Sequence, residues 1–422
     1  MPLSQLPRPT LKSVIQEVFT MRNFPMALWA LVIAAFALGA DEFVVAGVVE
    51  EIAAALHISL GAVGRFESAY ALGVAIGAPL FTAIGSRVSR RFMLLSTTGV
   101  FLAGNIISLF GPNYGWILTG RIVAALAHGA FFGIAAVFAA QLVSERLRGR
   151  AIATVFAGST AATILGAPIG AAVGRALGWR ATFGTLVLFG GLAIVGLLLL
   201  LPRDLGHKAT SRADHEATAS LRDQLRALRR PGVLIGLLTT FLGYGGVFTG
   251  YVYLAPQLRE ATGLGSGWVT PMFLLFGIGL FLGNHLGGKF ADRNLPQALM
   301  GSIGGLAVAL FALTALIHHP ITAAIGILAY GVGAFSVVAP LQLRVMQQAA
   351  DAPDIASAAN ISAFTLGSAL GIWLGGAAID SGLGVTSVDW VGGLIAAGGF
   401  GLALVSRRLD RTGTAVHLAH HH

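Results

Sequence analysis

Long apolar runs separated by short polar turns dominate the pattern along this chain. Each run is about 20 residues long, which is the helix length needed to cross roughly 30 Å of hydrocarbon. The pattern therefore predicts an all-α integral membrane protein with twelve transmembrane helices. The predicted spans are 26–49, 62–84, 93–110, 116–141, 151–174, 181–201, 233–256, 268–289, 297–317, 320–346, 355–379 and 387–406.

Lys and Arg are distributed unevenly between the turns. Most of the 27 basic residues fall on one side of the membrane if the N-terminus is cytoplasmic. Positive charge is retained on the cytoplasmic side of bilayers, so we expect both termini to be cytoplasmic. The same asymmetry explains the net charge of +9 without a nucleic-acid partner.

A basic, hydrophilic stretch divides the spans six and six, and the two halves resemble each other. Gly77, Ser86 and Arg87 around the end of the second span match Gly283, Asp292 and Arg293 around the end of the eighth. Two six-helix bundles from a duplicated unit indicate an alternating-access transporter. The expected division is 1–23, a cytoplasmic segment whose spacing fits an amphipathic helix or an unstructured leader; 24–201, the N-terminal bundle; 202–232, a cytoplasmic linker whose second part fits a surface helix; 233–406, the C-terminal bundle; and 407–422, a cytoplasmic tail ending in a tag remnant.

Composition excludes several other classes of protein. The chain is 55% hydrophobic and 11% charged, and so few charges could not cover a soluble protein. The absence of cysteine excludes disulfides, thiolate chemistry and sulfur-ligated metals. We expect no metal, no enzyme activity and no cofactor other than a proton gradient. An intramembrane hydrolase would need a base in register with Ser159, and a passive channel would need polar stripes or a charged ring; the sequence indicates neither.

Short motifs along the chain resemble those of a known family. They are Glu42-Phe43 through Gly47, Arg121 with Gly129, Gly166-Ala167-Pro168-Ile169-Gly170, Gly178-Trp179-Arg180, Leu254-Ala255-Pro256 and Phe276-Gly277-Ile278-Gly279. Their order resembles the major facilitator superfamily, specifically its 12-helix drug:proton antiporters, with similarity to bacterial chloramphenicol, sugar and purine efflux proteins. The resemblance implies a monomeric, multi-pass exporter embedded in the lipid bilayer of the bacterial inner membrane.

The resemblance also implies residues that control the conformational change. In this superfamily the loop after the second span latches the two bundles on the cytoplasmic side. Here it carries Arg87, Arg90 and Arg91, but Ser86 replaces the expected acid. These arginines could alternatively serve only as orientation charges. The equivalent loop after the eighth span keeps the acid. The fifth span resembles the glycine- and proline-rich span that lies between the bundles in exporters, and ordinary close packing without a coupling role is the alternative. The further candidates are Gly288, Asp292, Arg293, Gly166, Pro168 and Gly170.

Ionisable residues inside the predicted spans are the main functional candidates, because each costs about 2.5–3.5 kcal/mol on insertion scales. The helical rise places Asp41, Glu42, Glu67 and Arg121 in one layer of the N-terminal bundle. Arg121 would neutralise one carboxylate. Another carboxylate would take up and release the proton that drives exchange. The resemblance favours Glu42 for this role, with Asp41 as the alternative.

Structural roles remain open for the same residues. A buried acid could serve only to hold helix packing to Arg121, and Glu67 could form an interfacial pair with Arg65 at the outer mouth. His128 lies near the predicted midplane. It could relay protons, donate a hydrogen bond to substrate, or be a satisfied core histidine.

Polar and aromatic side chains near mid-span are candidates for the substrate cavity. An aromatic lining with few charges suits small, largely apolar molecules such as drugs. We therefore expect a proton-coupled antiporter of such molecules, and a sugar, nucleoside or purine exporter is the alternative. The candidate cavity residues are Phe131, Phe132, Tyr244, Phe248, Tyr251, Phe276, Tyr330, Phe335, Asn360 and Phe364.

Overall fold

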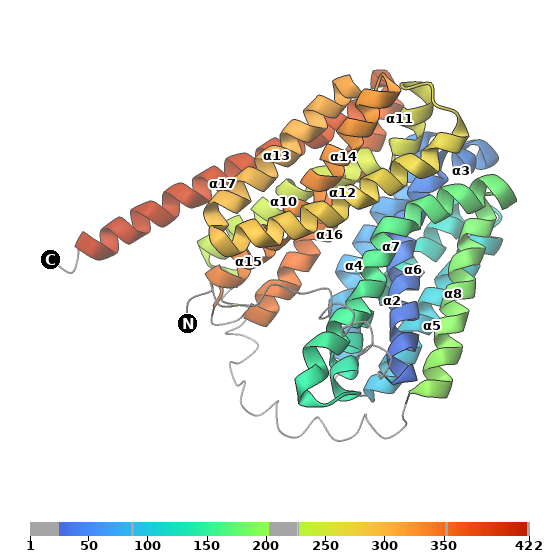
Figure 1. The fold of residues 1–422 in the computed structure, drawn as a ribbon, viewed down its shortest axis with the longest axis horizontal. Coiled ribbons are helices and arrows are strands. Elements are labelled where there is room, and N and C mark those ends of the chain that lie inside the picture. The colour runs from blue at the N-terminus through green and yellow to red at the C-terminus, as the bar shows by residue number, and fades with distance from the viewer. Residues whose placement is uncertain (1–24, 86–87, 202–225, 227, 351–352, 420–422) are drawn as a thin grey trace, which may run out of the picture.

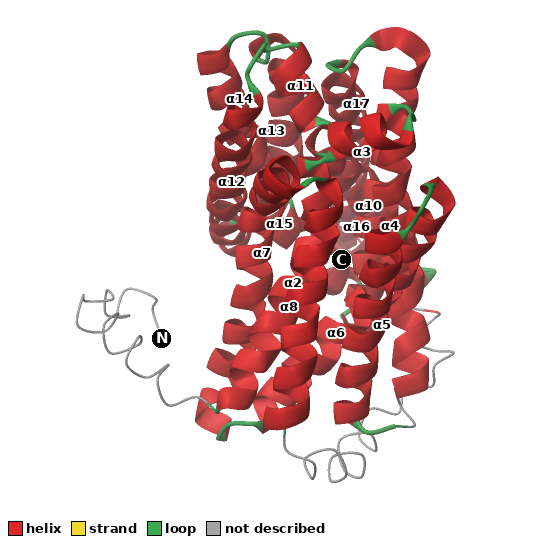
Figure 2. Ribbon diagram, turned by 90° about the vertical axis from the view of Figure 1, so that its right-hand side faces the viewer, coloured by secondary structure: helices red, strands yellow, loops and turns green. Residues whose placement is uncertain are grey.

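Helices make up nearly all of the described structure. The computed structural model describes residues 25–85, 88–201, 226, 228–350 and 353–419, and no strand occurs among them (Figure 2). Eleven segments in this part of the chain are long and apolar enough to cross a membrane. The helix α4 (Leu60–Gly85), with 26 residues, is a further long helix. The prediction of an all-α membrane fold is confirmed, and the side on which the termini lie stays a prediction.

The first half of the chain forms one group of helices. Within it, α2 packs against α7 and α8, while α6 packs against α4 and α5. The elements are α2 (Met26–Val44) with the 3₁₀ turn η2 (Val45–Gly47), α3 (Val49–Leu56), α4 (Leu60–Gly85), α5 (Arg90–Phe110), α6 (Tyr114–Gln141), η3 (Glu145–Leu147), α7 (Arg148–Leu177) and α8 (Trp179–Leu200).

The second half forms another group. Here α10 packs against α16 and α17, α12 against α14, and α13 against α17. The elements are α10 (Pro231–Tyr251), α11 (Leu254–Glu260), α12 (Ser266–Arg293), α13 (Leu295–Leu316), α14 (Pro320–Ser336), α15 (Val338–Gln348), α16 (Pro353–Ala378) with η4 (Ile379–Leu383), and α17 (Ser387–Ala419).

Some predicted spans are interrupted. The predicted helix over 233–256 breaks after Tyr251 and resumes as α11, and the one over 320–346 divides into α14 and α15. The predicted segment 1–23 and most of the linker 202–232 lie outside the described residues. Several helices begin where the sequence supplies a cap: Ser89, Asn113 and Asn294 each accept a hydrogen bond from a first-turn amide.

Small residues allow the helices of each half to pack closely. Gly166 and Gly170 of α7 lie against α2, where a Cβ on Gly166 would come within 2.8 Å of the Phe43 Cβ. In the other half, a Cβ on Gly279 of α12 would come within 2.7 Å of the Leu328 carbonyl oxygen of α14. Close backbone contact through glycine is a common means of helix association in lipid, where burial of apolar surface gives little driving force.

The two halves contact each other mainly through α4 with α16 and α7 with α12. They meet at the end of the molecule where α3 and α11 lie, and they diverge from there (Figure 1). We call this the α3–α11 end, and the opposite end, where α8 finishes and α10 begins, the linker end. Polar contacts close the α3–α11 end: Glu50–Arg259 at 3.2 Å, Arg65–Asp380 at 3.7 Å, and Arg175 donating to the Ser266 carbonyl oxygen at 2.6 Å.

A substitution of Gly170 tests the close approach of α2 and α7. A Cβ at this position would overlap the carbonyl oxygen of Val44, so we expect Gly170→Ala to destabilise the protein by about 1–3 kcal/mol. Gly133 of α6 is the matched control, because a Cβ there meets nothing within 4 Å and alanine has the higher helix propensity. Thermal unfolding in detergent should show a lower midpoint for Gly170→Ala and an unchanged or higher one for Gly133→Ala. Equal midpoints would contradict the packing described here.

Candidate functional site

A buried arginine joins three helices of the first half. Arg121 of α6 forms ion pairs with Asp41 of α2 and Glu67 of α4, the latter at 2.7 Å, and all three side chains are buried. One Arg121 amino group also donates to the Asp41 carbonyl oxygen at 3.1 Å. Because one guanidinium contacts two carboxylates, its charge is committed to this cluster.

Two further residues complete the surroundings of Arg121. Asn105 of α5 donates to the second carboxylate oxygen of Asp41 at 3.1 Å, and the Tyr70 ring lies 4.1 Å from the guanidinium carbon. A cation over an aromatic face is stabilised by the ring quadrupole. The sequence interpretation missed both residues. A lone Asn within an apolar span was the available signal for Asn105.

Glu42 lies beside this cluster but is oriented differently. Neighbouring residues on a helix are about 100° apart, so Glu42 does not share the direction of Asp41. Its carboxylate lies 3.8 Å from the His128 Nε2 atom, and its side chain keeps 32% of its surface accessible. Tyr70 and His128 share a hydrogen bond of 2.9 Å, so a polar chain connects Glu42 with the surroundings of Arg121.

A small cavity between the two halves brings the acids to the interface. Glu42, Glu67 and Tyr70 line it from the first half, and Phe248 and Ser368 line it from the second. The Ser68 hydroxyl, one residue after Glu67, donates to the Ala369 carbonyl oxygen across the interface at 3.1 Å. Glu42 and Glu67 therefore both lie where a relative movement of the halves changes their surroundings.

The alternative in which Glu67 pairs with Arg65 at the outer mouth is wrong. Arg65 contacts Asp380 of η4, whereas Glu67 is turned inward to Arg121. Positions two apart on a helix lie about 200° from each other, so the two side chains leave α4 in nearly opposite directions. His128 is mostly buried, shares a hydrogen bond with Tyr70 and lies near Glu42. These contacts fit a satisfied core histidine as well as a proton relay, so both roles stay open.

Most of the predicted cavity aromatics form one cluster at the interface between the halves. Its centre is Tyr251, whose ring lies 4.9 Å from Phe276 and 5.7 Å from both Phe43 and Phe248. The Tyr251 hydroxyl also donates to the Phe43 carbonyl oxygen at 3.4 Å. Tyr244, Phe364 and Tyr330 extend the cluster. Phe43 directly follows Glu42, so the cluster begins next to the acid.

Four predicted cavity residues lie elsewhere. Phe131 is buried within the first half, and Phe132 stacks on Phe156 and contacts His128. Phe335 lines a separate recess between α7 and α12. Asn360 is buried and donates to Gln342 at 2.8 Å.

The predicted gating residues are not brought together into one latch. Arg87 lies outside the described residues. Arg91 donates to the Leu198 carbonyl oxygen within its own half at 2.9 Å, and Arg90 is half-buried. Asp292 and Arg293 are exposed and make no ion pair within the described chain, and the adjacent Gly288 has open space around it.

The fifth span, α7, does contact α12 of the other half, but its predicted glycines do not make that contact. They fit the alternative of ordinary close packing. Gly166 and Gly170 face α2 in the same half, and Pro168 is buried inside α7. The contact of α7 with α12 instead uses Ile164, against which Gly277 packs. Glycines spaced four apart share one helix face, but the sequence does not say which helix covers that face.

The second half contains a buried acid that the sequence interpretation missed. Asp389 of α17 is fully buried and accepts a hydrogen bond from the Gln257 side chain at 3.2 Å. It stands near the start of the predicted span 387–406, and the sequence interpretation did not name it. It lies in the core of the second half, away from the Arg121 cluster.

Arg121 should be required for stability because of the acids that it pairs with. Arg121→Leu leaves Asp41 and Glu67 buried without this cation, and we expect a loss of about 3–5 kcal/mol. Adding Asp41→Asn and Glu67→Gln removes both charges and should restore most of that loss. The measurement is the thermal unfolding midpoint in detergent. A triple variant no more stable than Arg121→Leu would contradict an electrostatic role for the cluster.

Comparisons with known proteins show which family the chain belongs to. A sequence model of the Major Facilitator Superfamily matches residues 31–372. The inner membrane transport protein YdhP of Escherichia coli (strain K12) is 40% identical over 383 residues, covering 91% of this chain and 95% of that protein. A chloramphenicol resistance protein of Streptomyces lividans is 33% identical over 375 residues, covering 88% of this chain and 94% of that protein.

Solved structures show the same fold. A D-xylose-proton symporter superposes with a TM-score of 0.70 at 18% identity, over 90% of this chain and 96% of that chain. A bacterial homologue of the human lysosomal transporter Spinster, in an inward-facing and unoccupied conformation, superposes with a TM-score of 0.68 at 16% identity, over 90% of this chain and 96% of that chain. The resemblance noted in the sequence is confirmed: the chain belongs to the Major Facilitator Superfamily and is a multi-pass transporter of the bacterial inner membrane.

Proposed function

We propose that this transporter exports small, largely apolar organic molecules in exchange for protons, by alternating access. The observation that carries the proposal is the position of Glu42. It lines the cavity between the halves, whereas Arg121 is committed to Asp41 and Glu67. A carboxyl group with no arginine partner among the described residues can be charged in one conformation and protonated in the other, as proton-coupled exchange requires.

The aromatic cluster supports an apolar substrate. Phe43 and Phe248 connect the two halves next to Glu42, with ring centres 5.8 Å apart. A substrate that enters between these rings would separate them and change the water access of the adjacent carboxyl group. Proton release and substrate binding would then occur at neighbouring positions. The similarity to a chloramphenicol resistance protein supports a drug-like substrate.

The arrangement of the halves supports alternating access. If the linker end is cytoplasmic, as the distribution of basic residues predicts, the structure is closed towards the outside and diverges towards the cytoplasm. Protons entering from outside would neutralise Glu42 and favour outward release of the substrate. One copy of the chain contains every residue that this cycle uses, in accordance with the predicted monomer.

A polar substrate is the second candidate, and one observation favours it. Gln342 donates to the Ser357 hydroxyl at 2.7 Å and accepts from Asn360, and the side-chain amide oxygen Oδ1 of Asn360 has no partner within the described residues. Amide side chains of this kind recognise the hydroxyl groups of sugars or the edges of nucleobases. Transport of a sugar, nucleoside or purine with no transport of drugs would favour this candidate.

Glu42 should be required for coupling but not for the movement of substrate. In proteoliposomes with an imposed pH gradient, screened with drugs, sugars and nucleosides, we expect Glu42→Gln to abolish gradient-driven accumulation. Exchange of labelled for unlabelled substrate without a gradient should persist, because it needs no net proton transfer. Asp41→Asn is the matched control for an acid on the same helix, and it should also reduce folded yield through loss of the contact with Arg121.

Two outcomes of this experiment would exclude Glu42 as the coupling site or change its role. If Glu42→Gln accumulates substrate at the wild-type rate, Glu42 does not carry the driving proton. If both Glu42→Gln and Asp41→Asn do so, no acid on α2 carries it. Loss of exchange as well as accumulation in Glu42→Gln would indicate a role in substrate binding rather than in coupling.

The surroundings of Glu50 allow us to predict how pH shifts the equilibrium between the open and closed states of the α3–α11 end. Burial raises the pKa of Glu50 above its ordinary value of 4.5, with Arg259 opposing the shift and Glu51 and Glu260 adding to it. Opening this end would expose Glu50 and return its pKa to the ordinary range. The closed arrangement therefore binds the proton more tightly, and acidification from neutral pH towards 4.5 should favour closure.

Spin labels can measure this shift because the chain contains no cysteine. Labels are attached at Ala55→Cys on α3 and Gly265→Cys before α12. Double electron–electron resonance should show a larger population with a short distance between the two labels at lower pH. Glu50→Gln should increase that population at pH 7 and weaken its pH dependence. A short-distance population that falls on acidification in the wild type would contradict the predicted sign.

A further inference from the structure

A long groove runs along the outer face of the second half, away from the Arg121 cluster. It lies between α12, α13 and α14 and has a volume of about 1040 Å³. Gly301 and Gly305 form part of its floor, and a Cβ on either would meet nothing within 4 Å. The glycines of α13 therefore leave the floor of the groove open.

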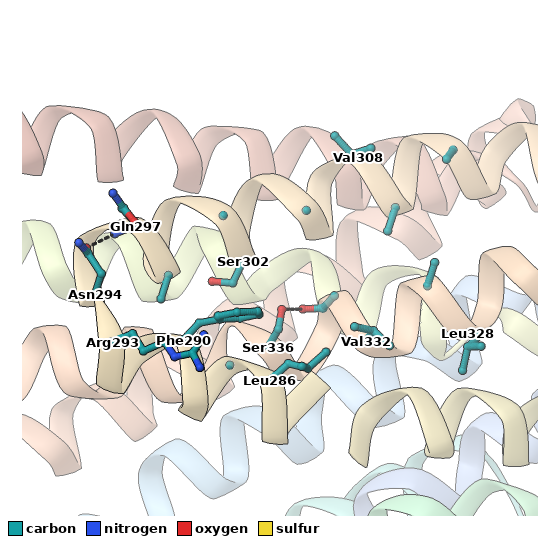
Figure 3. A pocket seen from close by; sticks show the side chains of 18 of the residues that line it. Leu286, Phe290, Arg293, Asn294, Gln297, Ser302, Val308, Leu328, Val332 and Ser336 are labelled. Carbon is teal, nitrogen blue, oxygen red and sulfur yellow. Dashed lines mark hydrogen bonds between the residues drawn. The ribbon is translucent and has the colours of Figure 1, made fainter. Parts of the chain in front are cut away.

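The walls of the groove are apolar along most of its length. Val308 and Leu328 line one end (Figure 3). The Ser302 and Ser336 hydroxyls in the middle donate to carbonyl oxygens of their own helices, at 3.2 and 2.9 Å. These hydroxyl groups are therefore satisfied, and the middle of the groove fits a hydrocarbon chain.

The other end of the groove is polar and basic. Arg293, Asn294 and Gln297 gather there, where α12 ends and α13 begins (Figure 3). Arg293 is exposed and has no hydrogen-bond or ion-pair partner within the described residues. Lys289 lies one turn before it, and the first turn of α13 adds partial positive charge. An anionic group at this position would have complementary charge.

The dimensions of the groove match one leaflet of a membrane. From Gln297 to Ala312 it follows α13 for about 22 Å at a rise of ~1.5 Å per residue. One leaflet contributes about 15 Å of hydrocarbon, or about 20–22 Å with its headgroup region. A lipid with its headgroup at Arg293 would therefore fit its acyl chain along Gly301 and Gly305.

A second recess increases the positive charge at the same end. It lies on the other side of Asn294 and Gln297, and Arg344 and Arg407 line it. Clusters of basic residues at the membrane surface attract anionic headgroups, whereas a zwitterionic lipid gains less from them. The charge distribution therefore favours anionic over zwitterionic lipids at this end of the groove.

We propose that this groove binds one anionic phospholipid, with the phosphate at Arg293 and an acyl chain along the glycines of α13. The site is independent of the proposed exchange mechanism, because it lies outside the interface between the halves. A bound lipid would fill the space between α12, α13 and α14. These three helices belong to the second half.

Quenching of a site-specific fluorophore by brominated lipids tests this proposal in a bilayer. Because the chain contains no cysteine, Gly305→Cys can be labelled specifically with bimane. In vesicles that contain brominated phosphatidylglycerol or brominated phosphatidylethanolamine at equal mole fraction, we expect the relative association constant at this site to favour phosphatidylglycerol about fivefold. This factor corresponds to the ~1 kcal/mol by which one interfacial arginine favours an anionic lipid.

Matched variants separate the groove from ordinary lipid contact. Gly191→Cys on α8, where a Cβ also meets nothing within 4 Å, should show no preference between the two lipids. Adding Arg293→Ala to Gly305→Cys should remove the preference, whereas adding Arg148→Ala, an exposed arginine at the linker end of the first half, should keep it. Native mass spectrometry of the unlabelled wild type should detect the monomer with one retained phosphatidylglycerol.

Three results would overturn the proposal. Equal quenching by both lipids at Gly305→Cys would mean that the groove contacts only bulk lipid. A preference that survives Arg293→Ala would mean that Arg293 does not bind the headgroup. Absence of quenching at Gly305→Cys, with normal quenching at Gly191→Cys, would mean that protein covers the groove, and a dimer mass would then identify a second copy as its occupant.

Discussion

The structure depends on a single guanidinium that serves two carboxylates inside an apolar helix bundle. Arg121 connects α6 to α2 and α4 through Asp41 and Glu67, and Asn105 extends the contact to α5. Removing one partner from a buried ion pair costs several kcal/mol, because the remaining charge has no water to replace it. The four helices are therefore held in register by charge, although lipid surrounds them. Glycine contacts such as those of Gly104 on Ala124 and Gly77 on Leu126 bring α5 and α4 close to α6, so that these side chains can meet.

This commitment of Arg121 gives Glu42 a different chemical role from the two acids beside it. Glu42 leaves α2 towards the cavity between the halves, where it contacts His128 and lies beside Phe248. Asp41 and Glu67 are both paired with Arg121. Glu67 also lines the cavity between the halves, but only Glu42 does so without an arginine partner among the described residues. The proposed exchange mechanism follows from this separation of roles among three nearby carboxylates.

Sequence alone could predict the spans and the identity of the important charges. Hydropathy is a property of the chain itself, and the cost of a charge in lipid makes residues such as Asp41 and Arg121 conspicuous. Pairing is harder, because it depends on the direction in which each side chain leaves its helix. Helix geometry alone could have excluded the Arg65–Glu67 pair, since these residues lie on nearly opposite faces. The covering of the α7 glycines by α2, and the contacts of Asp389 with Gln257, depend on tertiary packing that no local pattern contains.

Infrared titration of the carboxyl groups tests the central claim most directly and needs no knowledge of the substrate. In difference spectra of the purified protein between acidic and alkaline pH, a protonated carboxyl band that appears and disappears with pH should be present in the wild type. Because other carboxyl groups such as Glu50 also titrate, each variant is compared with the wild type. One component of this band should be lost in Glu42→Gln and retained in Glu67→Gln. A band that survives in Glu42→Gln and disappears in Glu67→Gln would assign the exchanging proton to the Arg121 cluster and contradict the separation of roles described here.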